Sequence, residues 1–371
     1  MTSPTSRPLT NFPYDPILDL APWVGQRQAS YRFQLLNGVT GENKGFLNPV
    51  RGSSTLSHDT TKTVKRTLTM GLGVDDAELV DPITDKVVPT MVMPNGQEYS
   101  LGKYVFTSIS YQQFTSGYIA NANLNDEMFI IDQQITRAFS TENRGIPPFT
   151  SATSTGIPIS TALRVLLKPF DFPLSIEGSE FGSRDSWTIG TMRGSIVEAL
   201  ALAGDYFSPW FSNEGVLTFI RAFNPAYRIP DLDWNTGDQV IRSSILKTSD
   251  VLNAPNRFVV TSNAPSNPDF PTYASADVPT NAPHSVQNRG FVVAEIHNLQ
   301  ALNDLQCGAM AQNLVQRQSI FETYTVTTAP DPRHDSYNVI RWQGDLWLEV
   351  SWSMGLSEGA PMSHTIRRAF K

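Results

Sequence analysis

The stretch TAPDPRHDSYNVIRWQGDLWLEVSWSMGL, residues 328–356, decides the fold class of this chain. Its second half alternates along a strand, so that one face carries Leu346, Leu348, Val350 and Trp352 and the other carries Trp347, Glu349 and Ser351. The pair Gln343-Gly344 separates this run from the shorter NVIRW, which predicts a strand, a turn and a second strand. The tryptophans of the stretch therefore share no single face, as a sugar-binding platform would require. We predict a structural element, with Trp352 in the core and Trp347 on a partly covered face.

The sequence before this stretch is also dominated by strand patterns. SYRFQLLNG alternates up to an Asn-Gly turn, and TKTVKRTLTMG places Val64, Leu68 and Met70 on one face with Thr and Lys opposite. Two further segments, GKYVFTSISYQQF and SGYIANANLNDEMFIID, are rich in β-formers. The residues up to about 140 are expected to form several strands without a clear helix, as in a small barrel or sandwich.

Three segments carry helical patterns instead. STALRVLLKPF is expected to be a helix that Pro169 ends, after a Pro/Gly/Ser/Thr linker. In SIVEALALAG, Ser195 and Glu198 match a capping box and Gly204 stands at the expected end. The longest helix is predicted over residues 299–318, with a buried stripe and an opposite face of Gln and Asn that carries little charge. Such a face is typical of a helix covered on both sides. The stripe consists of Leu302, Leu305, Ala309, Met310 and Leu314.

A proline-rich insert, residues 264–289, interrupts the last third of the chain. A loop of this length is usually disordered or a contact element. We expect a projecting loop in which Phe270 and Tyr273 anchor another protein, and its deletion is expected to leave the subunit folded.

Composition restricts the classes of function. Of 371 residues only 17% are charged and the formal net charge is −7, which argues against nucleic acid as the main partner. No apolar run is long enough to span a membrane. The first residues read as an extended arm rather than a signal peptide. A surface short of charge predicts that much of it is covered by other subunits.

The sequence contains no common catalytic motif. The five histidines fall in separate segments without metal-ligand spacing, so no metal or other cofactor is expected. Cys307 is read as a small core residue, and the Asp-rich DLDWNTGD as a turn rather than a calcium loop. His334-Asp335 lies in a loop without a partner serine motif. A pair of carboxylates that meet in space stays open, because sequence cannot exclude it.

The order of these elements resembles the baseplate hub, or tail-associated (minor tail) protein, of tailed bacteriophages. The residues that carry the resemblance are GDYFSPWFSNEGVLTFIR, the NRFVV strand, the Ala/Gln-rich helix and the closing pair DPRHDSYNVIRW…WLEVSWSM. Minor tail proteins of long-tailed phages of actinobacteria are the most similar members. The resemblance implies a mainly β (α+β) fold, with two small β-barrel tube-type domains joined by helix-containing domains.

The resemblance also implies a division of the chain. An extended arm at 1–24 precedes a first barrel at 25–140 and a helix-containing peripheral domain at 141–230. A second barrel at 231–371 carries the insert and the long helix. Many relatives continue into a fibre or lytic domain beyond the position of Lys371, which leaves receptor binding and wall digestion in doubt.

What the resemblance implies for function is a non-enzymatic, trimeric ring at the tail tip of a virion, made in the host cytoplasm. Its partners are further copies of itself, the distal tail protein, the tape measure protein and other minor tail or fibre proteins, while genome DNA passes without specific binding. The residues expected to contact partners are Phe270, Tyr273 and Trp347. A carbohydrate-binding tail module with an exposed aromatic platform, and a cell-wall hydrolase with a carboxylate pair in a cleft, are the alternatives.

Overall fold

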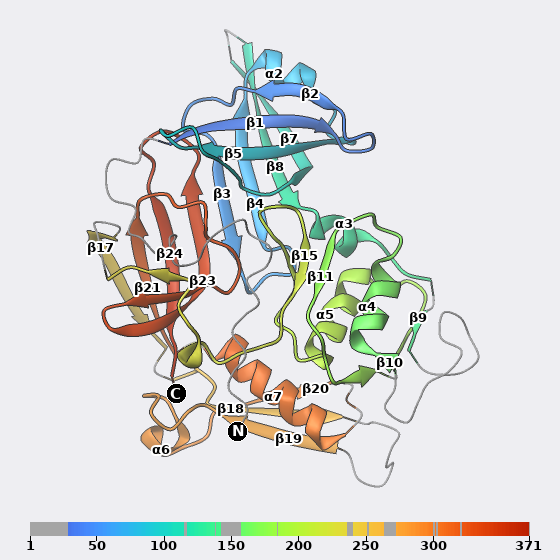
Figure 1. Ribbon diagram of the computed structural model, residues 1–371, viewed down its shortest axis with the longest axis vertical. Helices are drawn as coiled ribbons and strands as arrows, with labels where there is room; N and C mark the ends of the chain where they lie inside the picture. The colour runs from blue at the N-terminus through green and yellow to red at the C-terminus, as the bar shows by residue number, and fades with distance from the viewer. Residues whose placement is uncertain are drawn as a thin grey trace.

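The computed structural model describes residues 29–114, 117–137, 139–141, 157–183, 185–235, 240–250, 252–262, 272–299, 301, 303–319 and 321–370. The predicted arm at 1–24, most of the linker before the first predicted helix, and Phe270 lie outside these ranges. Figure 1 shows the first strands at the top and the last strands at the left, with helices α3 to α5 at the right and α7 below.

One fourteen-stranded sheet runs through the molecule. Its first strands are β1 (Ser30–Asn37), β2 (Asn43–Leu47), β3 (Thr55–Asp59), β4 (Arg66–Leu72), β5 (Asp85–Val92), β6 (Glu98–Ser100), β7 (Tyr104–Phe114) and β8 (Gly117–Asp126). Its later strands are β16 (Leu232–Asp233), β17 (Val240–Ser249), β21 (Glu322–Thr328), β22 (Val339–Trp342), β23 (Asp345–Gly355) and β24 (Met362–Arg368). Their order is β17-β21-β24-β23-β3-β4-β8-β7-β5-β1-β2, with β22 beside β23, β16 beside β22 and β6 beside β5.

The mainly β fold with some helices is confirmed, but the strands of the two predicted barrels are not separate. β3 pairs antiparallel with β23, with His58 opposite Trp352. Trp352 and Met354 then pack into the same core as Leu56 and Leu68. Among the described residues the pairing closes neither group of strands into a barrel. We call β1 to β8 the first sheet region and β16, β17 and β21 to β24 the second sheet region. The two are joined by backbone hydrogen bonds and by a shared core.

The strand–turn–strand prediction at the C-terminal end is confirmed. β22 and β23 pair from Val339↔Leu348 to Trp342↔Asp345. The turn residues Gln343 and Gly344 have φ of 53° and 85°, the left-handed geometry that a tight hairpin requires.

Helices and small sheets cover the other side of the molecule. Besides α2 (Val74–Leu79), which follows β4, these are α3 (Met128–Gln133), α4 (Ile159–Leu167), α5 (Arg193–Ala203), the 3₁₀ turn η1 (Pro225–Tyr227), α6 (Val286–Arg289) and α7 (Asp304–Gln318). The small strands are β9 (Phe139–Ser140), β10 (Ile157–Pro158), β11 (Leu174–Ile176), β12 (Gly182–Ser183), β13 (Ser186–Trp187), β14 (Trp210–Phe211), β15 (Leu217–Phe219), β18 (Arg257–Ser262), β19 (Thr272–Asp277) and β20 (Ala294–Asn298). The two short helices α2 and α3 stand where strands alone were expected.

The second predicted barrel is divided between two places. β18, β19 and β20 form their own three-stranded sheet, which packs on α7. Phe258 and Val260 of β18 share a core with Leu163 of α4, Leu200 of α5 and Leu314 of α7. Residues 252–262, 272–299 and 303–319 therefore pack with α4 and α5, in what we call the helical region. Of the described strands after residue 231, β16, β17 and β21 to β24 join the large sheet.

The prediction of a projecting loop at 264–289 is wrong for residues 272–289. β19 pairs with β18 along its whole length, from Arg257↔Asp277 to Ser262↔Thr272. After it, Val278 and Ala282 are 3% and 0% exposed. Alternating small and polar residues, rather than the prolines, decide the structure of this segment.

The long helix begins later than predicted, at Asp304 instead of residue 299, because Asn303 caps it. Met310 and Leu314 are buried as expected, but Leu305 is 75% exposed and Leu302 lies outside the described residues. The polar face is covered, and the same chain covers it: Gln306 Nε2 donates to the carbonyls of Gly182 and Ala203. Contacts within one chain therefore explain why this face of the helix carries little charge.

The capping box predicted at Ser195 is also wrong. α5 begins two residues earlier, at Arg193, and its N-cap Met192 makes no side-chain bond. Gly204 does end this helix, donating its N–H to the carbonyl of Leu200.

These two helix starts give a matched pair of substitutions. Asn303→Ala removes the bond from the Gln306 N–H to Asn303 Oδ1 (2.9 Å) and is expected to lower the free energy of unfolding by about 1 kcal/mol. Ser195→Ala, on the exposed face of α5, is expected to change it by less than about 0.5 kcal/mol. Urea unfolding of both variants measures the difference, and a larger loss in Ser195→Ala would contradict the helix start at Arg193.

Candidate functional site

A buried loop, residues 329–338, lies where the two sheet regions meet the helical region. We call it the junction loop. Its Asp331, His334 and Ser336 are 4%, 2% and 0% exposed. Polar groups buried this deeply require hydrogen-bond partners. Those of the junction loop bond to one another and to residues of both sheet regions and of the helical region.

Local hydrogen bonds shape the junction loop. Arg333 donates from Nη2 to Asp331 Oδ2 at 2.7 Å. The N–H of Asp335 donates to Asn338 Oδ1 at 2.8 Å, and the N–H of Ser336 donates to Asp335 Oδ1 at 2.8 Å. The loop is therefore ordered by its own Asp and Asn side chains, as is typical of turns rich in these residues.

Arg66 of β4 joins the first sheet region to this loop. Its side chain is 1% exposed, and Nη2 donates to Asp335 Oδ1 at 2.6 Å. Nη1 donates to Asn213, whose own Nδ2 donates to the carbonyl of Pro332 at 3.0 Å. Burial acts to lower the pKa of Arg66, but Asp335 and other neighbours outweigh it, and the net shift is upward. One guanidinium thus connects β4, the β14–β15 turn and the junction loop.

His58 and Lys65 make two further connections. His58 Nε2 lies 2.6 Å from Ser336 Oγ, and its ring stacks on Trp352 with centroids 5.4 Å apart. Burial, and then the charge of Arg66, lower the pKa of His58 well below its usual value, so the ring is neutral. Lys65 Nζ donates to Ser208 Oγ at 2.5 Å, and burial lowers its pKa to about 8.

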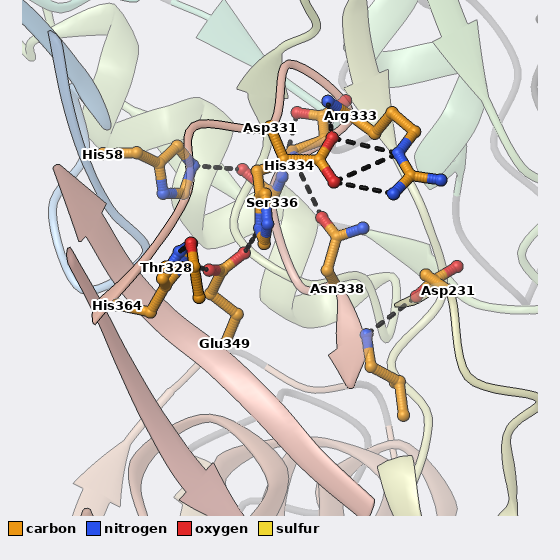
Figure 2. Close-up of polar contacts among 12 residues, drawn as sticks. His58, Asp231, Thr328, Asp331, Arg333, His334, Ser336, Asn338, Glu349 and His364 are labelled. Carbon is orange, nitrogen blue, oxygen red and sulfur yellow. Dashed lines mark hydrogen bonds and ion pairs between the residues drawn. The ribbon is translucent and has the colours of Figure 1, made fainter. Parts of the chain in front are cut away.

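Glu349 of β23 is held between two histidines from different elements (Figure 2). His334 Nδ1 lies 2.8 Å from Oε2, and His364 Nδ1 lies 2.6 Å from Oε1. His364 comes from β24, and its Nε2 lies 2.7 Å from Thr328 Oγ1. These three residues, His334, Glu349 and His364, form what we call the His–Glu–His cluster. All three side chains are 0–1% exposed.

Burial disfavours charge throughout this cluster. It raises the pKa of Glu349 to about 7, against the opposing effect of His364. It lowers the pKa of His364, and the neighbouring His334 adds to that shift. The arrangement is that of a dry polar site rather than of a cleft open to substrate.

The sequence patterns did not predict this cluster, because its histidines lie in separate segments of the chain. The turn of 331–338 and the β23–β24 pairing bring them together. A signal was present: Glu349 is the one charged residue in the run Leu346–Val350, and a lone carboxylate in an otherwise apolar strand requires a buried partner.

The predicted contact residues have different surroundings. Trp347 is 3% exposed, packs against Tyr324 and Trp342, and donates from Nε1 to the carbonyl of Trp342 at 3.0 Å. It offers no surface to a partner, contrary to its predicted role. Tyr273 is 65% exposed on β19, where contact with a neighbour stays a prediction. Nothing is described for Phe270.

The same burial bears on the alternative functions. Trp347, Trp342 and Trp234 are 3%, 4% and 5% exposed, so they form no platform for a sugar. The carboxylates of the junction loop and of Glu349 are bonded to Arg or His and 1–8% exposed, which closes them to a polymeric substrate.

Cys307 lies on α7 and is fully buried, as predicted. Burial raises the pKa of its thiol to about 11, so the reactive thiolate is scarce. We expect slow labelling by a thiol reagent in the native protein and fast labelling after unfolding. Cys307→Ser is expected to cost about 1–3 kcal/mol of stability and to leave assembly intact, and rapid native labelling would contradict the buried position.

Comparison with solved structures places the fold among tail proteins. The chain is similar to a tail protein from Neisseria meningitidis MC58, with a TM-score of 0.59 and 12% identity over 91% of this chain and 97% of that one. It is similar to the 43 kDa tail protein of prophage MuSo2 from Shewanella oneidensis, with a TM-score of 0.61 and 11% identity over 91% and 98%. A prophage tail protein from Listeria monocytogenes EGD-e gives 0.58 and 8% over 92% and 95%.

At these identities the likeness shows the fold alone. The resemblance to phage tail proteins that the order of elements predicted is confirmed at that level. No family model matches the chain, and no curated protein does. Among the described residues, no helix has both the length and the apolar character that crossing a membrane requires.

Proposed function

We propose that this protein is a structural component of a phage tail tip, a baseplate hub that assembles as a homotrimeric ring. The observation that supports this most directly is the likeness of the fold to three tail proteins over 91–92% of the chain. In this role the ring continues and closes the tail tube, and the protein resides in the virion after synthesis in the host cytoplasm.

Exposed apolar side chains support a role in assembly. Ile83 and Val39 are 91% and 79% exposed at one end of the first sheet region, with Phe46 at 52%. Ile229, between η1 and β16, and Leu252, between β17 and β18, are 73% and 71% exposed. The distal tail protein, the tape measure protein and other minor tail or fibre proteins are the proposed neighbours.

The channel of such a ring has to let DNA slide. A basic lining would hold phosphates through counterion release, so we expect few Lys or Arg side chains to face the lumen. The net charge of −7 agrees with this expectation.

Solution mass tests the proposal. Light scattering of the purified chain, alone and mixed with its tail neighbours, is expected to reveal a species of three chains, and electron microscopy to reveal a ring. A protein that stays monomeric in both conditions, or a ring with another number of copies, would refute the trimer. Release of peptidoglycan fragments by the purified protein would refute the non-enzymatic role.

A further inference from the structure

Glu349 is unlike the other buried carboxylates around the junction loop. Asp331 has Arg333 at 2.7 Å and Asp335 has Arg66 at 2.6 Å. Glu349 has only imidazole partners among the described residues, and both aspartates act electrostatically on it as like charges. A buried carboxylate without a cationic partner is costly, so the site requires a compensating positive charge, which either a proton or a metal ion can supply.

The hydrogen bonds of His364 show where that charge belongs. Thr328 Oγ1 donates to the carbonyl of Ala329 at 2.9 Å, and it therefore accepts from the Nε2–H of His364. A neutral His364 with its proton on Nε2 directs a bare Nδ1 lone pair at Glu349 Oε1, 2.6 Å away. Two lone pairs at this distance repel each other unless a proton or a metal ion lies between them.

We propose that His334, Glu349 and His364 form a binding site for one divalent transition-metal ion, and that zinc is the ion it fits. Two imidazole nitrogens and one carboxylate are a ligand set that zinc uses. The three donor atoms lie within 4.8 Å of one another, and all three residues are buried. Thr328 is the outer partner that fixes the ring of a metal-bound histidine.

The two N–O separations in the cluster are shorter than those of a metal site. Zinc ligands at about 2.0–2.1 Å from the ion stand about 3.3 Å apart in a tetrahedral site. The N–O separations of 2.8 and 2.6 Å must therefore widen by roughly half an ångström on binding.

The position of the site defines its role. The ligands come from the junction loop, β23 and β24, so a bound ion would link the loop to the sheet. Asp335 and Ser336 of the same loop bond to Arg66 and His58 of the first sheet region. The role is structural, because side chains that are 0–1% exposed leave no approach for a substrate.

Metal analysis of the untagged protein tests the inference. After removal of metal by a chelator and dialysis against zinc, the protein is expected to retain about one ion per chain. Substitution with cobalt is expected to produce the visible absorption of a tetrahedral site with nitrogen and oxygen ligands. The midpoint of thermal unfolding is expected to fall on chelation and to recover with zinc.

Three variants separate this site from adventitious binding. Glu349→Gln and His364→Gln are expected to weaken zinc binding by about tenfold or more. His284→Gln is the control, because His284 is also buried but bonds to Ser319 outside the cluster, and it is expected to keep the full content. Circular dichroism verifies that each variant is folded.

Two results would overturn the inference. The first is a wild-type protein that retains no zinc and whose unfolding midpoint ignores the chelator, which would mean that a proton occupies the site. The second is equal zinc content in wild type and Glu349→Gln, which would assign the ion to the surface. Both wild-type measurements remain decisive even where a variant fails to fold.

Discussion

Replacing Arg66 by methionine is expected to lower the free energy of unfolding by about 3–5 kcal/mol. Methionine fills most of the space of the arginine stem but leaves Asp335 and Asn213 without the guanidinium that both now contact. Removing one member of a buried ion pair strands the charge of the other, and this cost exceeds the net value of the pair. Arg66 connects β4, the β14–β15 turn and the junction loop. We therefore expect the variant to unfold less cooperatively and at a lower midpoint.

Arg32→Met is the matched control for this change. Arg32 pairs with Glu98 at 2.6 Å, the same distance as in the buried pair, but the two side chains are 56% and 50% exposed. An exposed pair contributes about 0–1 kcal/mol, so the comparison isolates burial from geometry. The double variant Arg66→Met/Asp335→Leu is expected to recover part of the loss, because it leaves no stranded charge. Urea unfolding measures all three variants, and equal losses in Arg66→Met and Arg32→Met would disprove the junction described above.

Local periodicity predicted the elements whose structure is decided locally. The hairpin around Gln343-Gly344 follows from alternation and a turn pair, and helix α4 follows from its apolar spacing before Pro169. Helix starts were predicted less well, because Ser195 offers a capping side chain that the fold does not use, whereas Asn303 is a cap that the pattern of apolar residues passed over.

Non-local pairing was beyond the sequence patterns. Nothing in the run TLSHD indicates that β3 pairs with β23, almost three hundred positions later, and this pairing merges the predicted barrels into one sheet. Lys65 lies on the strand face that was predicted to carry Thr and Lys, and it is buried where its Nζ donates to Ser208 of another region. The His–Glu–His cluster was missed for the same reason, since its members meet only when the junction loop folds against β23 and β24.

The proline-rich insert shows how composition misled where alternation was informative. Prolines suggested a loop, yet TYASAD has the alternating small and polar residues of a strand, and Ala274 and Ala276 contact the helical core. Asn256, which is fully buried, donates its amide to the carbonyls of His284 and Phe291. The segment therefore closes over β18 and is integral to the packing of α7.

Deleting residues 264–289 and joining the ends with a short glycine-serine linker is accordingly expected to abolish cooperative folding of the helical region. The deletion removes β19 from its pairing with β18 and uncovers the β19-facing side of α7. It also takes Val278 and Ala282 out of the core and leaves the amide of Asn256 with one carbonyl fewer. The loss of a whole strand exceeds the net stability of a typical domain, about 5–15 kcal/mol, once the exposed core is counted. Thermal melting and limited proteolysis of the variant measure this outcome.

Tyr273→Ser separates the structural role of the insert from a contact role. The Tyr273 side chain is 65% exposed, so its loss is expected to change the unfolding free energy by less than about 0.5 kcal/mol. Any weakening of attachment to a tail neighbour in this folded variant therefore reports a surface contact, which the deletion cannot do because it disrupts the core. A deletion variant that melts cooperatively at the temperature of the parent would support the projecting loop and contradict the packing described here. A strand that packs on α7 cannot be removed without destabilising that helix.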